Sequence, residues 1–134
     1  MERRKLLTAS PDTSVARAAK LMAERNAGAV MVLVDDQLVG ICTERDIVFR
    51  VVARDLDVDN TQIGAVMTPA PQTIRPEEPF GRALLIMHEN GFRHLPVLEG
   101  GALIGVVSAR SAMDPDLEEF GVEAARRRWF ASTR

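Results

Sequence analysis

The chain repeats itself once, and this duplication is the feature that most restricts its fold. Residues 8–45 lie over residues 73–110 at a constant offset of 65 positions, without a gap. Two copies at so long a period do not make a solenoid. The sequence therefore predicts a duplicated domain with a pseudo-twofold axis between its copies. Identical pairs recur along the overlap: Thr8 and Thr73, Pro11 and Pro76, Arg17 and Arg82, Ala18 and Ala83, Met22 and Met87, Val32 and Val97, and Gly40 and Gly105.

Short apolar runs between turn residues predict three strands in each copy. In both copies the second and third strands are joined by a few turn residues, which predicts a hairpin. The expected strands cover residues 6–10, 30–34 and 38–42 in the first copy and 72–75, 94–98 and 102–107 in the second.

Helices are expected between the first and second strands of each copy. One begins near Ser14 and the other near Pro79, where a proline at the first helical position loses no hydrogen bond. Asn26 and Gly91 stand where a C-terminal residue with positive φ is expected. A further helix over residues 44–54 closes the first copy, so each copy has the order β-α-β-β-α.

These elements divide the chain into two domains, at residues 5–55 and 72–113. A linker rich in Asp, Asn, Thr and Pro joins them over residues 56–71. Residues 114–134 predict an extra C-terminal helix. Acidic residues occupy its first turn and Arg126–Arg128 occupy its last turn, and this order of charges complements the helix dipole.

Composition favours a soluble module. The net charge of −2 and the pI of about 5.7 give no electrostatic attraction to nucleic acid. The longest apolar run, residues 29–34, is far too short to span a membrane. The single cysteine, Cys42, excludes a disulfide or a cysteine-based zinc site within one chain. We expect a cytoplasmic protein with neither a nucleic-acid nor a membrane partner.

A hydroxyl and an acid follow the third strand of the first copy. Thr43 and Asp46 predict a capped helix start, in which the hydroxyl accepts from a backbone N–H. The same pair can also serve a ligand, because a helix start attracts anions and a carboxylate has acceptor capacity for two hydroxyls. Both uses are compatible. In the second copy Ser108 replaces Thr43, and Ser111 replaces Asp46.

Taken in order, these motifs resemble a tandem pair of cystathionine-β-synthase (CBS) domains, a Bateman module, over residues 5–113. The resemblance rests on four segments, Gly40–Asp46, Val66–Pro69, Gly91–Val97 and Gly105–Ser108. It implies an α/β (α+β) fold in which the sheets of the two units pack together. It also implies a stand-alone, non-catalytic regulatory module that requires no cofactor and binds an adenosyl ligand.

An adenine nucleotide, AMP, ADP or ATP, is the ligand that the resemblance favours. S-adenosylmethionine and NAD are alternatives, as is a structural dimerisation module that binds no ligand. An enzyme is not expected, since no nucleophile with a base, metal cluster or paired carboxylate is evident. The partners expected are the nucleotide, a second copy of the chain, packed by helical faces, and an unidentified regulated protein.

The resemblance places the ligand in the cleft between the two units. Asp46 would then accept from ribose hydroxyls while Thr43 faces phosphate. Arg93 would pair with phosphate, and His94 would hydrogen-bond or stack. Arg45 is a further phosphate candidate, with plain solvation of the surface as its alternative.

The remaining candidates are apolar or contribute their backbones. Core packing is an equal alternative for Met67 and Ile74, and a surface role is an alternative for the Arg93 segment. The opposite cleft has no acid at the position of Asp46, so the sequence predicts one nucleotide site per chain. The expected adenine slot is lined by Met67, Gln72, Thr73 and Ile74, and its apolar wall by Leu95 and Pro96.

Overall fold

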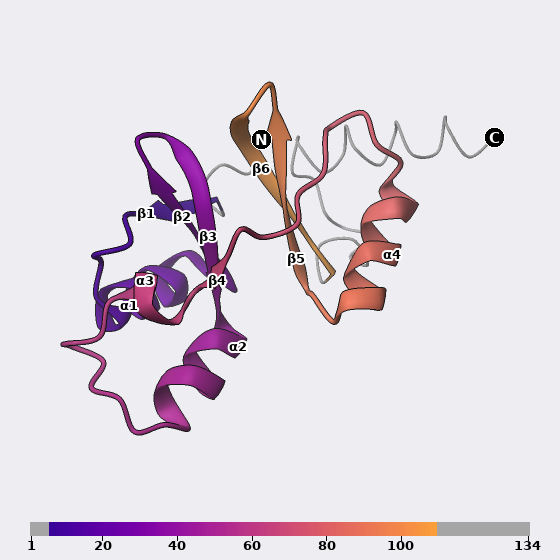
Figure 1. Ribbon diagram of the computed structural model, residues 1–134. Helices are drawn as coiled ribbons and strands as arrows, with labels where there is room; N and C mark the ends of the chain where they lie inside the picture. The colour runs from indigo at the N-terminus through magenta and orange to yellow at the C-terminus, as the bar shows by residue number, and fades with distance from the viewer. Residues whose placement is uncertain (1–5, 110–134) are drawn as a thin grey trace. The chain divides into compact units, whose positions relative to one another are not determined.

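The computed structural model describes residues 6–109, which form two compact units divided between Pro71 and Gln72. We call residues 6–71 the first unit and residues 72–109 the second unit. Both combine helices with antiparallel hairpins in a mixed α/β fold, as the sequence predicts (Figure 1). The predicted C-terminal helix, together with the end of the second domain, lies outside the described residues.

The first unit contains a four-stranded sheet in the order β1-β2-β3-β4. The helix α1 (Val15–Arg25) connects β1 to β2, which pair in parallel, and the other neighbours are antiparallel. A crossover helix between parallel strands is the usual solution, because a tight turn cannot join them. The strands are β1 (Leu7–Ala9), β2 (Ala29–Val34), β3 (Gln37–Thr43) and β4 (Thr68–Pro69).

Local capping residues set the ends of α1 where the sequence predicts them. The hydroxyl of Ser14 accepts a hydrogen bond from the Arg17 backbone N–H at 3.0 Å. Asn26 ends the helix with φ of 51°, in the left-handed region that asparagine tolerates better than most residues. The predicted start of α1 near Ser14 and its predicted end at Asn26 are therefore confirmed.

The helix expected over residues 44–54 changes its hydrogen bonding after one turn. The helix α2 (Glu44–Ile47) continues into a π-helical segment, Val48–Val52. The Ala53 N–H accordingly donates to the Val48 carbonyl, five residues back, at 2.9 Å. Such π-helical turns are rare and often accompany functional sites. The sequence pattern does not separate this geometry from an ordinary helix.

The segment 56–71, expected as a linker, packs as part of the first unit. It contains α3 (Ile63–Val66) and β4, and Gln62 forms an isolated bridge with Ser14. The backbone of Gly64 donates to the Pro11 carbonyl at 2.9 Å, and a Cβ at Gly64 would lie only 2.8 Å from the Cβ of Pro11. This close approach explains a glycine inside so short a helix.

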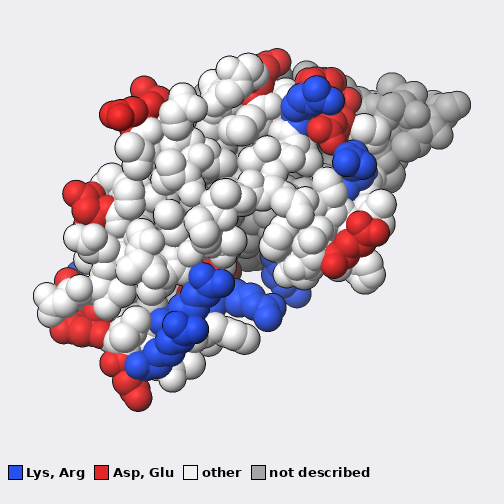
Figure 2. All heavy atoms as spheres, viewed as in Figure 1, with Lys and Arg blue, Asp and Glu red and all other residues white. Residues whose placement is uncertain are grey.

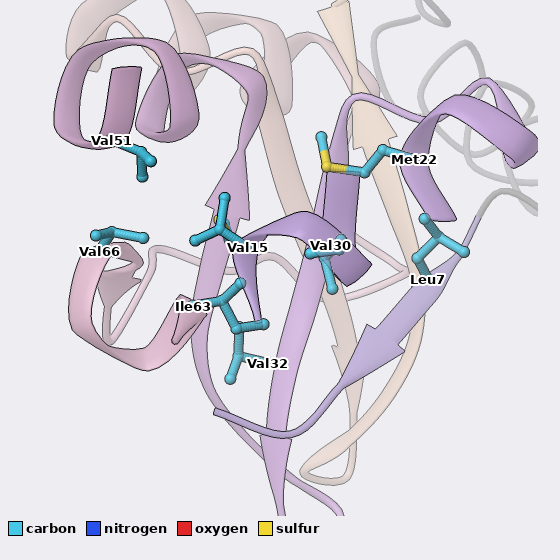
Figure 3. Close-up of a cluster of buried hydrophobic side chains, with 10 residues drawn as sticks. Leu7, Val15, Met22, Val30, Val32, Val51, Ile63 and Val66 are labelled. Carbon is cyan, nitrogen blue, oxygen red and sulfur yellow. The ribbon is translucent and has the colours of Figure 1, made fainter. Parts of the chain in front are cut away.

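The core of the first unit lies between the sheet and the helices that cover one of its faces (Figure 3). It is aliphatic, as the low aromatic content of 4% requires. Ile63 and Val66 bring α3 into this cluster, so the segment between the two repeats contributes directly to the stability of the first unit. The buried residues are Leu7, Val15, Ala18, Met22, Val30, Val32, Cys42, Val51, Ile63 and Val66.

The second unit repeats the first at the predicted offset. Its helix α4 (Phe80–Asn90) and strands β5 (His94–Glu99) and β6 (Ala102–Ser108) have the bounds of α1, β2 and β3 shifted by 65. Ile74 forms a parallel bridge with Val97, where the sequence predicts a first strand. Six core positions correspond in the same way: Phe80, Ala83, Met87, Leu95, Val97 and Val107.

One detail of α4 differs from the prediction. Pro79, expected at the first helical position, is the N-cap residue, with extended φ and ψ of −59° and 141°. Proline fits either position because its fixed φ suits both conformations. Gly91 ends the helix with φ of 70°, as predicted. A register shift interrupts both hairpins, between Val32 and Leu33 and between Val97 and Leu98.

Candidate functional site

The Asp46 carboxylate is fixed at the start of α2 by a complete capping box. The Thr43 N–H donates to Asp46 Oδ2 at 2.9 Å, and the Asp46 N–H donates to Thr43 Oγ1 at 3.2 Å. The Thr43 hydroxyl is also 3.2 Å from Asp46 Oδ2, to which it can donate. Asp46 is only 6% exposed, so these bonds replace most of its water. The predicted cap is confirmed.

Two further residues reach the same carboxylate, and the sequence reasoning missed both as site residues. The Thr68 hydroxyl in β4 donates to Asp46 Oδ1 at 3.2 Å. Arg50 Nε in the π-helical segment lies 3.7 Å from the same oxygen. The Met-Thr-Pro sequence around Thr68 was noticed only as a family motif. Arg50 is four residues after Asp46, a spacing that places charged pairs on one helix face.

Arg50 also binds the backbone at the end of α3. Its Nη1 donates to the Val66 carbonyl at 3.3 Å and to the Met67 carbonyl at 3.1 Å. The last carbonyls of a helix lack hydrogen-bond donors within the helix, and the Arg50 guanidinium supplies donors to them here. One arginine therefore connects the C-terminal end of α3 and the Asp46 carboxylate within the first unit.

Met67 is partly exposed and packs against β3. A Cβ at Gly40 would overlap its sulfur, so the absence of a side chain at Gly40 makes room for the thioether. Met67 also packs at the edge of the first unit's core. The structure thus gives Met67 the packing role that the sequence left as an alternative to a ligand contact.

Arg45 is exposed on α2, and its guanidinium carbon lies 4.7 Å from the centre of the Phe49 ring. This is a cation–π arrangement. Figure 2 shows lysine and arginine side chains gathered over α2 in the lower part of the view. A positive surface of this kind attracts anions.

The candidates at the start of the second unit differ in burial. Gln72 is exposed, Thr73 is partly exposed and Ile74 is buried in the core. The Ile74 N–H donates to the Pro96 carbonyl at 3.0 Å, and its carbonyl accepts from Leu98 at 2.9 Å. Ile74 therefore has the core role that was its alternative.

The Arg93–Pro96 segment enters β5 with side chains in different surroundings. Arg93 is exposed, and its carbonyl accepts from the Ala109 N–H at 2.9 Å. Leu95 belongs to the core of the second unit, so any ligand contact from it would come from its backbone. Pro96 is also buried. Arg93 is the one exposed residue of this segment, and His94 is partly exposed.

His94 combines burial with an unsatisfied nitrogen. Its Nδ1 is buried without a hydrogen-bond partner in the described part of the chain. Burial, and to a smaller extent the Arg93 charge, lower the pKa of His94 to about 4. The imidazole is therefore neutral at pH 7, and its buried nitrogen lacks a hydrogen bond within residues 6–109.

This lowered pKa predicts a loss of stability in mild acid. The unfolded chain takes up the His94 proton near pH 6.5 and the folded chain only near pH 4, so unfolding is increasingly favoured as the pH falls between these values. We expect His94 to lower the free energy of unfolding by up to roughly 3 kcal/mol over this range, from the size of the pKa change.

Urea denaturation at several pH values measures this effect as a difference between the wild type and His94→Gln. The difference should be constant above pH 7 and change steadily from pH 6.5 to 4. His88→Gln, at an exposed position on α4, is the matched control and should follow the wild type. Parallel pH profiles for wild type and His94→Gln would contradict the prediction.

Residues 6–109 give little support to a metal site, a cysteine nucleophile or a membrane-spanning helix. No group of three or more His, Cys, Asp and Glu side chains there is placed to hold a metal ion. Cys42 is fully buried, and burial, aided by the Asp46 charge, raises the pKa of its thiol to about 12. A thiol in that state is a poor nucleophile. No helix in this range has the length and apolarity to cross a membrane.

Comparisons with known proteins agree on one family. The family model described as the CBS domain matches residues 1–53 and 63–115. A CBS domain-containing protein of Arabidopsis thaliana is 40% identical over 104 residues, which cover 77% of this chain. The chain spans only about a fifth of the length of that relative and of two further Arabidopsis relatives.

Solved structures show the same fold. A putative signal-transduction protein with CBS domains from Burkholderia ambifaria has a TM-score of 0.77 and 33% identity, covering 87% of this chain and 89% of its own. A CBS domain protein from Pyrobaculum aerophilum complexed with AMP has a TM-score of 0.74 and 22% identity, with 92% of both chains covered. Two matched domains, the duplicated architecture and these neighbours lead to one conclusion: the chain belongs to the CBS domain family, as a tandem pair.

Proposed function

We propose that this chain is a non-catalytic sensor that binds AMP, ADP or ATP through Asp46. Binding would change the shape of the chain, and a partner protein would respond to that change. The observation that carries the proposal is the buried Asp46 carboxylate, held by Thr43 and Thr68 at the position where the family places its ribose-binding acid. Tandem CBS modules are typically regulatory, and a neighbour of this fold was solved with AMP.

The hydrogen-bond capacity of Asp46 is consistent with a ribose ligand. An ionised carboxylate has about four acceptor positions, and Thr43 and Thr68 occupy three of them. The two threonine hydroxyls can rotate, because each is both donor and acceptor. A ribose diol can therefore take the remaining position and replace the Thr43 hydroxyl, while the Thr43 N–H and the Thr68 hydroxyl stay bound to the carboxylate.

The second unit carries further residues that we propose as ligand contacts. Arg93 offers an exposed cation for phosphate, and His94 is a further candidate, to hydrogen-bond or stack. Gln72 and Thr73, with the backbones of Ile74, Leu95 and Pro96, are the adenine contacts that we propose from the second unit, and Met67 is the one from the first unit. Arg45 adds positive charge near Thr43.

A thermal-shift panel tests this function. AMP, ADP, ATP, S-adenosylmethionine and NAD are added separately, and each should be recovered unchanged by chromatography. A ligand at a hundred times its Kd raises the stability by about 2.7 kcal/mol, which is a shift of several degrees for a protein of this size. No shift with any compound would favour the alternative, a dimerisation module without a ligand.

We also propose that two copies assemble through the outer side of α2 and the π-helical segment. Three apolar side chains there, Val48, Phe49 and Val52, are more than half exposed. Clustered apolar residues on a surface commonly mark an interaction site. A second copy is the simplest partner, because closed twofold dimers are the commonest soluble oligomers.

A further inference from the structure

Arg50 and Thr68 approach the Asp46 carboxylate from two different elements of the first unit. Thr68, in β4, donates to Oδ1 at 3.2 Å, and Arg50, in the π-helical segment, brings its Nε to 3.7 Å from the same oxygen. The other oxygen, Oδ2, is occupied by Thr43. Both carboxylate oxygens therefore have partners, which fixes the plane of the carboxylate.

Arg50 has a second set of contacts that ties it to the chain around Thr68. Its Nη1 donates to the carbonyls of Val66 and Met67, the two residues before Thr68. The guanidinium is a planar group with several donors in fixed directions, so one end can bind the backbone while the other faces the carboxylate. Arg50 is thus bound to the segment just before Thr68 and faces the carboxylate oxygen to which Thr68 donates.

The repeat adds an independent observation. At the offset of 65, Ser111 occupies the place of Asp46 and Pro115 occupies the place of Arg50. The second copy thus lacks the acid and also lacks the arginine. The acid and the arginine therefore occur together in the first copy and are both absent from the second.

We propose that Arg50 and Thr68 are positioning residues that hold the Asp46 carboxylate in the orientation in which it recognises the two ribose hydroxyls. This inference rests on the proposed function. Arg50 and Thr68 touch the carboxylate and need not touch the nucleotide.

Calorimetry with two probes, AMP and 2′,3′-dideoxy-AMP, tests the proposal. The dideoxy compound lacks both hydroxyls but keeps the base and phosphate. We expect the wild type to prefer AMP by about ten-fold or more, since hydrogen bonds to a charged acceptor are strong. Arg50→Met and Thr68→Val should lower this preference several-fold, with affinity for the dideoxy compound kept within about two-fold.

Two controls separate positioning from a general structural effect. Thr68→Ser keeps the hydroxyl and should retain most of the preference. Arg54→Met removes a charge from the exposed end of the same segment and should leave the preference unchanged. Parallel losses of affinity for both probes in Arg50→Met and Thr68→Val would overturn the positioning role alone. A wild type that binds AMP no better than the dideoxy compound, or not at all, would overturn ribose recognition by Asp46 and this inference with it.

Discussion

Asp46→Ala is expected to weaken AMP binding at least ten-fold and to lower the free energy of unfolding by about 1–3 kcal/mol. The loss of affinity follows from removing the acceptor for the ribose. The loss of stability follows from the capping box, because the Thr43 N–H and the Thr68 hydroxyl lose a buried acceptor. Calorimetry measures the affinity for AMP, and urea denaturation measures the free energy of unfolding.

Asp46→Asn separates the two effects. An asparagine oxygen can still accept from the Thr43 N–H, so most of the stability should remain. Its amide carries no charge and presents a donor where the ribose needs an acceptor, so the affinity should still fall. Ser111→Ala should change binding little, because the site is predicted to be single. Two equivalent sites per chain, or undiminished binding by Asp46→Ala, would show that the chosen site is wrong.

Phe49→Glu is expected to convert a dimer of twice 14.7 kDa into a monomer of 14.7 kDa. The Phe49 side chain is 57% exposed in the single chain, next to the exposed Val48 and Val52. An aromatic residue at the centre of an interface commonly contributes 2 kcal/mol or more, and a buried unpaired charge adds a further cost. The dissociation constant should therefore rise at least about thirty-fold.

Sedimentation at micromolar concentration measures the masses. Val34→Glu is the matched control, because Val34 is also an exposed apolar residue but lies at the end of β2 and not on the α2 face. That variant should sediment like the wild type. A monomeric wild type, or a Phe49→Glu variant that stays dimeric, would exclude assembly through this face.

Most of the fold could be predicted because its signals are local. Ser14 and Asn26 mark the ends of α1 through their own side chains, and the offset of 65 transfers α1, β2 and β3 to the second copy. The strand expected over residues 72–75 is reduced there to one bridge at Ile74. Two details could not be predicted, because the sequence pattern there fits more than one backbone geometry. Nothing in the apolar periodicity of residues 44–54 distinguishes a π-helical turn, and proline at position 79 suits the N-cap as well as the first turn.

The site was predictable only in part, for a similar reason. Thr43 and Asp46 are three residues apart, so their contact follows from helix geometry. Thr68 reaches Asp46 from 22 residues away, and Arg50 reaches the Met67 carbonyl from 17 away. Contacts of this kind depend on how the segment 56–71 folds back onto the first unit. His94 was named as a candidate, but the burial of its Nδ1 without a partner in residues 6–109 depends on packing that a sequence does not display.

The register shift at Val32 and Leu33 has an exact counterpart at Val97 and Leu98 in the other hairpin. A one-residue insertion in a strand turns every following side chain to the opposite face, so a shift acquired in one copy alone would misplace that copy's core. The simplest history is that a single ancestral unit already carried the irregular hairpin when its gene was duplicated. The difference between Asp46 and Ser111 would then have arisen afterwards, in two copies that already shared one backbone.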